Sequence, residues 1–333
     1  MIISVTGFGF SGATAVVDYL HGYDHVKLYD TVEFQLIHQA DGILDLKYHL
    51  TQNAERIACN AAISRFIRLQ KTGVFAARIK KVIGSRYDEL SNEYVRNLVL
   101  SEWTGRSNYD PDDITRDSHI PIIRKFQSGL NYASKIVGLD LHFPPLKKRY
   151  FSMLSETDFD SITRQYLQKL FEALNISSTD DSVLEMLFSP TDPTLGSEFF
   201  DNAKCIVVVR EPRDIYIYGK KSKLSHTFMP WDDVVQYVKY YRALRENTKY
   251  TDTALWVQYE DLIYNYEEVS RRIREYLGYD FRPQHEFRYF DPNISVKYTN
   301  LKNSAPELAA DVSYIEKELE EFLYMFPEKY TPR

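Results

Sequence analysis

A glycine-rich loop close to the N-terminus has the residue types that bind phosphate. Residues 7–14 read Gly-Phe-Gly-Phe-Ser-Gly-Ala-Thr, between a β-branched run at residues 2–6 and a helical pattern at residues 14–20. Glycines let backbone N–H groups converge on an oxyanion, and the positive end of the following helix adds to the attraction. The loop therefore predicts a site for a phosphate-bearing nucleotide. Its alternative role is a tight turn that only packs the strand against the helix.

Two nucleotide-binding patterns match this loop, and each match is incomplete. The Walker A pattern G-x-x-x-x-G-K-[ST] fits Gly7, Gly12 and Thr14, but Ala13 stands where the lysine would reach the β- and γ-phosphates. This disfavours magnesium-dependent hydrolysis of a nucleoside triphosphate. The Rossmann pattern G-x-G-x-x-G also fits, with Asp30 near the position of the acidic residue that holds a ribose. The loop alone leaves the nucleotide open.

The pattern of apolar residues around the loop predicts an α/β fold. The run at residues 205–209 is typical of a strand buried on both faces, and residues 254–257 form a further strand candidate. A helix is expected to begin at residues 210–214, with Pro212 near its first position. Further helices are predicted at residues 231–247, 259–277 and 307–326.

We expect a single domain with a P-loop-like parallel sheet, flanked by helices and carrying a large helical insertion. The expected limits are about 1–35 and 195–290 for the α/β frame, 36–190 for the insertion, and 291–333 for a C-terminal lid and helix. The insertion is assigned as helical because its apolar residues recur with a spacing near 3.6.

Composition excludes several classes of protein. The net charge of −6 disfavours a general nucleic-acid or anionic-membrane surface, although a local basic region is compatible with it. Cys59 and Cys205 lie outside any Cys/His cluster, so no structural zinc site is expected. No segment approaches the roughly 20 apolar residues of a membrane helix. The N-terminus lacks a signal-peptide pattern, so the expected compartment is the cytoplasm.

Two further segments narrow the choice of nucleotide. Residues 207–216 read V-V-V-R-E-P-R-D-I-Y, and residues 257–262 read V-Q-Y-E-D-L. In order and spacing they resemble the V-V-R-[DN]-P-[RK]-D-V segment and the R-Y-E-D-L turn of sulfotransferases that use 3′-phosphoadenosine-5′-phosphosulfate (PAPS). Residues 10–14 then resemble the K-S-G-T-T loop of that family. The resemblance covers the α/β frame, and the helical middle and the C-terminus match it only loosely.

The resemblance implies a PAPS site made of the loop and one arginine, without a metal ion. Backbone amides and hydroxyls of the loop would hold the 5′-phosphosulfate, and they belong to Gly9, Ser11, Gly12, Ala13 and Thr14. Arg210 falls at the position of the arginine that holds the 3′-phosphate, and a planar guanidinium suits phosphate oxygens. Its alternative role is a surface ion pair at a strand end.

The sequence departs from the family pattern at two positions. Tyr218 occupies the place of a serine eight residues after the arginine, so its hydroxyl or that of Ser222 would have to substitute. Phe10 occupies the place of the loop lysine, which in the family stabilises the bridging oxygen as sulfate leaves. Lys297 and Lys302, in a turn-rich segment that suits a lid, are the candidates for the missing cation. Their alternative role is that of solvated surface lysines.

The base that activates the acceptor stays open between two family patterns. Glycan-modifying members place a glutamate about twenty to thirty residues after the loop, where this chain has Glu33 at the expected open end of the sheet. A helix-start glutamate is the alternative for that position. Small-molecule members use a histidine from the middle of the chain, for which His142 and His226 are candidates. Asp30 and His38 are weaker candidates.

These observations together predict a cytoplasmic, PAPS-dependent sulfotransferase. It would move a sulfuryl group to an acceptor hydroxyl and release 3′-phosphoadenosine-5′-phosphate, with a saccharide as first choice of acceptor and a lipid or steroid alcohol as second. No nucleic-acid partner is expected. The candidate lining of an acceptor groove is aromatic and comprises Tyr216, Tyr218, Phe228, Trp231 and Tyr237, although helix packing is the simpler role for most of these residues. Two alternatives stay open, namely a P-loop kinase or NTPase and a family member that binds a nucleotide or glycan without turnover.

Overall fold

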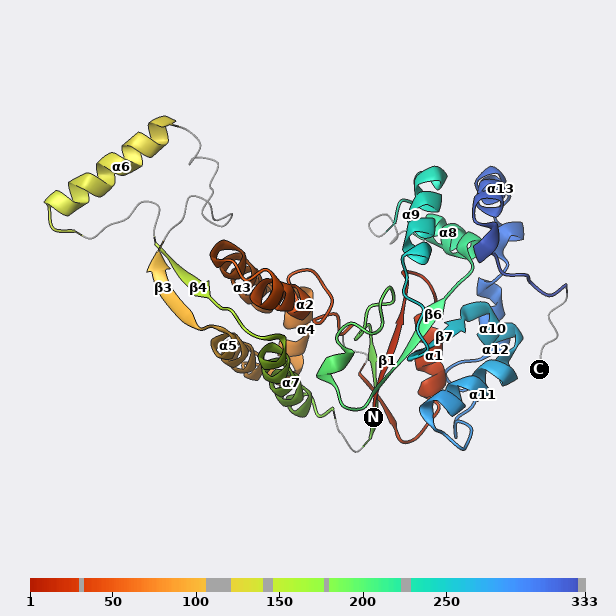
Figure 1. Ribbon diagram of the computed structural model, residues 1–333. Helices are drawn as coiled ribbons and strands as arrows, with labels where there is room; N and C mark the ends of the chain where they lie inside the picture. The colour runs from red at the N-terminus through yellow and green to blue at the C-terminus, as the bar shows by residue number, and fades with distance from the viewer. Residues whose placement is uncertain (30–32, 106–120, 140–145, 177–179, 223–228, 329–333) are drawn as a thin grey trace. The chain divides into compact units, whose positions relative to one another are not determined.

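The computed structural model describes the chain in two compact units (Figure 1). The α/β unit comprises Met1–His38 and Asn175–Arg333, and the helical unit comprises Gln39–Leu174. The described residues are all of 1–333 except 30–32, 106–120, 140–145, 177–179, 223–228 and 329–333. Residues 175–190, which were expected in the insertion, therefore group with the sheet.

Within the described residues, five strands form a parallel sheet in the order β2-β5-β1-β6-β7. The strands are β1 (Ile2–Gly7), β2 (Val26–Tyr29), β5 (Asp181–Glu185), β6 (Ala203–Val209) and β7 (Ala254–Gln258). Central β1 pairs with β5 on one side and β6 on the other, so that Val5 lies opposite both Glu185 and Ile206. Because all pairings are parallel, the carboxyl ends of the strands meet at one edge. The predicted α/β class with a parallel sheet is confirmed.

Helices follow the carboxyl ends of three of these strands. α1 (Ala13–Leu20) follows β1, α8 (Pro212–Lys221) follows β6, and α10 (Tyr259–Tyr264) follows β7. The remaining α-helices of the described part of this unit are α9 (Val234–Glu246), α11 (Tyr266–Leu277), α12 (Pro292–Ser295) and α13 (Ala309–Glu318). The single helix predicted at residues 307–326 is shorter than expected, because short 3₁₀ turns at Pro306–Leu308 and Glu320–Phe322 flank α13.

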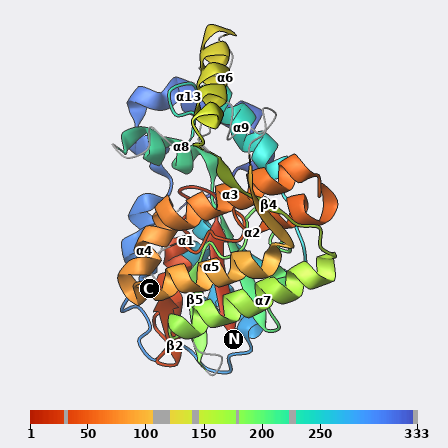
Figure 2. The ribbon, with the colours of Figure 1, turned by 90° about the vertical axis from the view of Figure 1, so that its left-hand side faces the viewer.

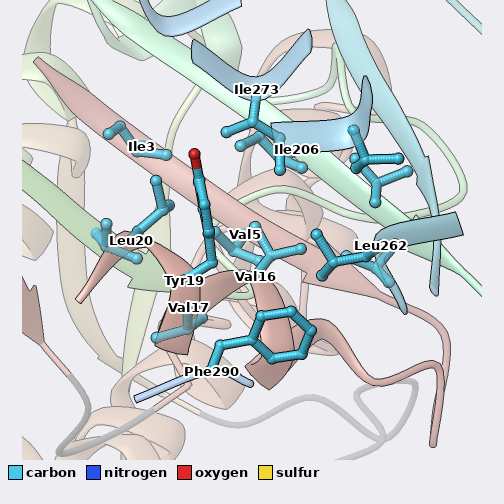
Figure 3. Packing of buried hydrophobic residues seen from close by; sticks show 14 of the residues in the cluster. Ile3, Val5, Val16, Val17, Tyr19, Leu20, Ile206, Leu262, Ile273 and Phe290 are labelled. Atoms are coloured by element: carbon cyan, nitrogen blue, oxygen red, sulfur yellow. The ribbon is translucent and has the colours of Figure 1, made fainter. Parts of the chain in front are cut away.

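One hydrophobic core joins the sheet to α1, α10 and α11. Ile3 and Val5 of β1 lie beside Ile206 of β6, and Leu262 of α10 and Ile273 of α11 pack against the same group (Figure 3). All five side chains are fully buried. Burying each contributes roughly 1.5–3 kcal/mol. This packing holds α1 against the sheet and thereby places the loop before α1 at the carboxyl edge.

The helical unit contains helices and a two-stranded antiparallel hairpin. Its helices are α2 (Ile43–Lys47), α3 (Arg56–Thr72), α4 (Val74–Ile83), α5 (Arg86–Leu98), α6 (Pro121–Ile136) and α7 (Glu156–Ala173). α5 and α7 lie side by side (Figure 2), and the rings of Tyr94 and Tyr166 stack between them with centroids 4.3 Å apart. The hairpin of β3 (Ser101–Gly105) and β4 (Lys147–Phe151) was not predicted. Among the described residues, no helix is both long and apolar enough to cross a membrane.

Candidate active site at the carboxyl edge of the sheet

A pocket of about 760 Å³ lies at the carboxyl edge of the sheet. Residues that follow four strands line it, namely the loop after β1, Glu185 at the end of β5, Arg210 after β6 and Tyr259 after β7. Small-molecule sites usually have volumes of roughly 300–1,000 Å³. Ligands of open α/β sheets bind at this edge. Arg210 is the only lysine or arginine among the described residues of the lining.

Two glycines allow the tight turn between β1 and α1. Gly12 precedes α1 with φ of 81°, in the left-handed region that favours glycine. A Cβ atom on Gly12 would come within 2.5 Å of the Tyr259 ring, and one on Gly7 would lie 2.1 Å from Ser11 Oγ. At Gly12 a larger residue requires the Tyr259 ring to move, and at Gly7 it would also lie 2.8 Å from the backbone carbonyl oxygen of Val208.

The turn also leaves a polar group ready for a ligand. Ser11 Oγ is buried and has no hydrogen-bond partner among the described residues. A buried hydroxyl without a partner costs about 1–3 kcal/mol, which a phosphate oxygen could offset. The N-terminus of α1 begins directly after this turn at Ala13, so its free N–H groups share the lining with Ser11. The loop thus fits an anion such as a phosphosulfate.

Phe10 has a strained backbone and a packed ring. Its φ of 62° is uncommon for a bulky residue. The ring lies 5.7 Å from the ring of Tyr218 and 5.6 Å from that of Trp231, measured between centroids. The position at which the K-S-G-T-T pattern has its lysine is therefore used here for aromatic packing on one side of the pocket.

Arg210 joins the loop to the C-terminal segment. The side chain is 5% exposed, and its Nη1 and Nη2 donate to the carbonyl oxygens of Phe10 (3.0 Å) and Tyr298 (2.5 Å). The guanidinium lies 4.8 Å from the centroid of the Tyr259 ring. Its Nε is buried, has no hydrogen-bond partner among the described residues, and stands 4.0 Å from Glu260 Oε1. Donor capacity is left for an anion in the pocket.

Two buried carboxyls lie close to Arg210. Glu260 accepts hydrogen bonds from the side chain of Gln258 and from the Glu211 N–H, and burial raises its pKa to about 7 against the opposing effect of Arg210. Glu211 caps α8, and burial with the nearby Asp214 raises its pKa to about 7 as well. Arg213 Nε donates to Glu211 Oε1 at 2.6 Å. Arg210 of the pocket lining is therefore next to a buried network of carboxyls and guanidinium groups.

The C-terminal segment supplies one wall of the pocket. Asp214 on α8 accepts hydrogen bonds from the backbone N–H groups of Asn300 and Leu301, both at 2.8 Å. These bonds fix the chain that carries Ser295 and Tyr298, which line the pocket. The segment expected to act as a lid is thus part of the site.

The two lysines expected in that segment do not belong to the described lining. Lys297 is exposed, with Nζ 5.0 Å from the centroid of the Tyr298 ring. Lys302 is exposed and pairs with Glu316 at 3.5 Å. In this conformation neither of the two lysines predicted to replace the loop lysine lines the pocket.

Three carboxylates line the rest of the pocket. Glu33 is exposed and accepts a 2.6 Å hydrogen bond from Gln35 Nε2. The next residue, Phe34, donates its N–H to the carbonyl oxygen of Glu185 at 2.7 Å, which holds Glu33 at the end of β5. Asp18, on α1, also lines the pocket, and burial raises its pKa. Neither Glu185 nor Asp18 was a sequence candidate.

The structure brings most of the predicted donor-site residues together with Glu33, the predicted base. The described lining contains Gly9, Phe10, Ser11, Gly12, Ala13, Thr14, Glu33, Arg210 and Tyr218. Tyr218 is 39% exposed and lies under the Arg210 guanidinium at 5.8 Å. Ser222 is absent from this described lining, and its N–H closes the end of α8 on the Tyr218 carbonyl oxygen at 3.0 Å.

The other candidates fall outside the pocket or outside the described residues. His142, His226, Asp30 and Phe228 belong to segments that the structure does not describe. His38 Nε2 lies 2.8 Å from the Met186 carbonyl oxygen, and burial lowers its pKa. The aromatic residues Tyr216, Trp231 and Tyr237 are buried in one cluster that packs α8 against α9 and α13. They act in the core, whereas Tyr218 reaches the pocket.

A comparison with protein families finds a match to part of the chain. Residues 142–283 match the model of the Sulfotransferase family. Over this range the chain is similar to the sulfotransferase family. The matched range includes Arg210 and the V-Q-Y-E-D-L motif but not the glycine-rich loop. Members of that family are enzymes that transfer a sulfuryl group with PAPS as the donor.

Solved structures of bacterial sulfotransferases are also similar to this one. The sulfotransferase domain of the Synechococcus PCC 7002 olefin synthase is 16% identical, with a TM-score of 0.44 over 98% of this chain and 95% of that chain. The sulfotransferase domain of the curacin biosynthetic pathway is 12% identical, with a TM-score of 0.43 over 98% of both chains. The sulfotransferase STF9 from Mycobacterium avium is 13% identical, with a TM-score of 0.35 over 100% of this chain and 78% of that chain. No curated protein matches the sequence.

Proposed function

We propose that the pocket binds PAPS and that this sulfotransferase moves the sulfuryl group to a hydroxyl of a saccharide. The observation that carries the proposal is that one pocket combines the turn before α1 with the buried Arg210. Both Ser11 Oγ and Arg210 Nε are buried without a hydrogen-bond partner among the described residues, so both can bind an anion.

The two anion-binding groups suit the two charged ends of PAPS. We assign the 5′-phosphosulfate to residues 9–14, where Ser11 and the N-terminus of α1 supply donors. We assign the 3′-phosphate to Arg210, whose fork can bind two phosphate oxygens. When bound, PAPS supplies a sulfuryl group that is already activated by its bond to phosphate.

The acceptor is proposed to enter on the side of Glu33. Its carboxylate would take the proton of the acceptor hydroxyl as the new O–S bond forms and the S–O bond to the donor phosphate breaks. Glu33 is exposed within the lining, which suits a group that must meet an incoming substrate. The half-exposed rings of Tyr289 and Tyr298 also line the pocket and offer faces for stacking on a sugar.

Because Phe10 has no side-chain donor, other hydrogen-bond donors must stabilise the negative charge that develops on the leaving phosphate. The N–H groups of α1 and Ser11 are the described groups in place. Lys297 and Lys302 stay proposed as the additional cation, which would require residues 296–304 to rearrange when the donor binds. The free cysteines Cys59 and Cys205 are both buried and support the proposed cytoplasmic compartment.

The donor and the reaction can be tested separately. Calorimetric titration is expected to show binding of 3′-phosphoadenosine-5′-phosphate without magnesium, and magnesium-dependent ATP binding in its place would favour a P-loop kinase. Transfer of label from PAPS is then measured on a panel of saccharides and of steroid or lipid alcohols. Transfer to alcohols alone would overturn the saccharide assignment. Donor binding with no transfer to any member of the panel would favour a non-catalytic binding protein.

A further inference from the structure

Helix α6 has an apolar side that no other described element packs against closely. Counting 100° per residue over residues 125–136, a single arc of about 120° holds four apolar residues, namely Phe126, Leu130, Ala133 and Ile136, and Val137 follows the last residue of the helix. Phe126, Ile136 and Val137 are each more than two-thirds exposed. α6 makes no extensive contact with another element of the described chain. In soluble proteins such an apolar arc usually packs against a core, so we expect the arc of α6 to bind a partner.

The charge of the same segment is opposite to that of the protein. Residues 121–139 contain three basic residues and no acidic one, whereas the whole chain has a net charge of −6. Lys125 borders the apolar arc, Lys135 lies on the opposite side of the helix, and both are exposed. At the start of β4, by contrast, Lys148 pairs with Glu102 of β3 at 3.1 Å, so its charge is already balanced. The helix that carries the exposed apolar arc is thus itself basic.

We propose that α6 binds the surface of an anionic lipid bilayer. A helix with an apolar arc and a basic polar side lies in the plane of the headgroups, with its apolar side chains at the acyl boundary. Each lysine or arginine near such a surface strengthens binding roughly fivefold. The acidic remainder of the chain is repelled by the same surface, which leaves α6 as the favoured point of contact.

A second copy of the helix is a poorer occupant. Two copies of α6 would bring their basic residues together without a single acidic partner in residues 121–139. Like charges at a helix interface destabilise it. Charge complementarity therefore favours the lipid surface. This inference is independent of the proposed donor and acceptor.

The test uses the full-length protein and vesicles. Co-sedimentation is expected with mixed vesicles of phosphatidylcholine and phosphatidylglycerol and not with phosphatidylcholine alone. Added salt is expected to weaken the binding because it screens the basic residues. Equal binding to both kinds of vesicle, or binding to neither, would overturn the proposal.

A matched pair of variants separates the apolar arc from charge. Phe126→Glu and Ser128→Glu each add one negative charge to an exposed position of α6, but only the first removes a side chain of the arc. We expect Phe126→Glu to lower the partition coefficient more than tenfold, and Ser128→Glu to lower it about fivefold or less. Equal losses in the two variants would show that the arc does not enter the bilayer and would overturn the proposal.

Sedimentation velocity tests the rival occupant. If the wild type dimerises, Phe126→Glu abolishes the dimer, and vesicles retain no protein, then α6 pairs with a second copy and the lipid proposal is wrong. Circular dichroism and binding of 3′-phosphoadenosine-5′-phosphate check that both variants stay folded. Because donor binding is measured apart from vesicle binding, failure of this inference leaves the proposed function standing.

Discussion

At the scale of single residues, Arg210 has two roles that one experiment can separate. It holds the loop and the C-terminal segment through the carbonyl oxygens of Phe10 and Tyr298, and it faces the pocket. We expect Arg210→Ala to weaken binding of 3′-phosphoadenosine-5′-phosphate more than tenfold, because charge-assisted hydrogen bonds contribute about 1.5–3 kcal/mol. Calorimetry gives the affinity.

Arg210→Lys is the matched control for charge. Lysine keeps the positive charge but not the planar fork, so its affinity should lie between those of the wild type and Arg210→Ala. A thermal melt of each variant shows whether the loop is still folded. Wild-type affinity in a folded Arg210→Ala protein would contradict the assignment of the 3′-phosphate to this residue.

Two carboxylates of the pocket, Glu33 and Glu185, are candidates for the general base. Glu33 is exposed, and Glu185 ends β5 beside it. We expect Glu33→Gln to lower kcat about a hundredfold while donor affinity is unchanged, because general-base catalysis contributes about 10²–10⁴-fold. Steady-state kinetics with labelled PAPS measures the effect, and Glu185→Gln is the control, with a much smaller loss expected.

The two outcomes that would contradict this assignment point to different residues. A larger loss in Glu185→Gln would move the base to the strand end. Full activity in both variants would move it to a histidine, and His142 and His226 would then be the next residues to change.

At the scale of elements, the turn between β1 and α1 depends on close contact as well as on φ. Gly12 and Gly278 have nearly the same left-handed conformation, with φ of 81° and 80°, but only at Gly12 would a Cβ atom meet a ring, that of Tyr259. Gly278→Ala should therefore lower the free energy of unfolding by about 1 kcal/mol, the cost of the left-handed conformation alone. Gly12→Ala adds a 2.5 Å contact with Tyr259 and is expected to lose clearly more.

Urea denaturation measures both free energies of unfolding, and calorimetry measures the donor affinity. Only Gly12→Ala should weaken donor binding, because of the two glycines only Gly12 lines the pocket. Equal effects of the two substitutions would show that the contact with Tyr259 is relieved without cost.

The sequence predicted the elements whose signals are local. The apolar runs of β1 and β6 end at a glycine loop and at Pro212, so both strand-to-helix units could be located. β5 reads Asp-Ser-Val-Leu-Glu, too short and too polar to stand out, and Glu185 was missed with it. The β3–β4 hairpin was missed because some forty residues separate its strands, so no turn signal links them.

In the candidate site, too, the sequence located only the residues that have a local signal. The loop and Arg210 were located because each directly follows a recognisable strand. The position of Glu33 rested on the family resemblance, and the hydrogen bond of Phe34 to Glu185 that anchors it is a tertiary contact. A turn-rich pattern around Lys297 indicated a lid but could not show which side chains face the pocket, since that depends on the bonds from Asp214.

At the scale of the molecule, buried charges tie together distant parts of the α/β unit. Arg213 on α8 donates to Glu211 and to Glu316 on α13, each at 2.6 Å. Glu260 on α10 accepts from the Glu211 N–H and faces Arg210. This network therefore links α8 and α10, which follow two different strands, to the C-terminal helix α13. We expect a change in one of its carboxyls to affect the packing of all three helices.

We expect the protonation of Glu260 to make the stability of the protein depend on pH. Burial raises the pKa of Glu260 from 4.5 to about 7, so the folded protein favours the protonated carboxyl. Its contribution to stability is fully present below about pH 4.5 and is lost as pH rises through 7. Glu260→Gln stays neutral, so the variant should gain stability relative to the wild type across this window. One pKa unit corresponds to about 1.4 kcal/mol, so the expected gain is on the order of 3 kcal/mol.

Urea denaturation at a series of pH values gives the difference in free energy of unfolding between variant and wild type. Glu320→Gln, at an exposed position, is the control and should follow the wild type at every pH. In Glu260→Gln the new amide oxygen can still accept the Glu211 N–H, so the substitution removes the charge and keeps that bond. A difference that does not change with pH would mean that Arg210 keeps Glu260 ionised in the folded state, and the network would then be an ion pair at every pH at which the enzyme is folded.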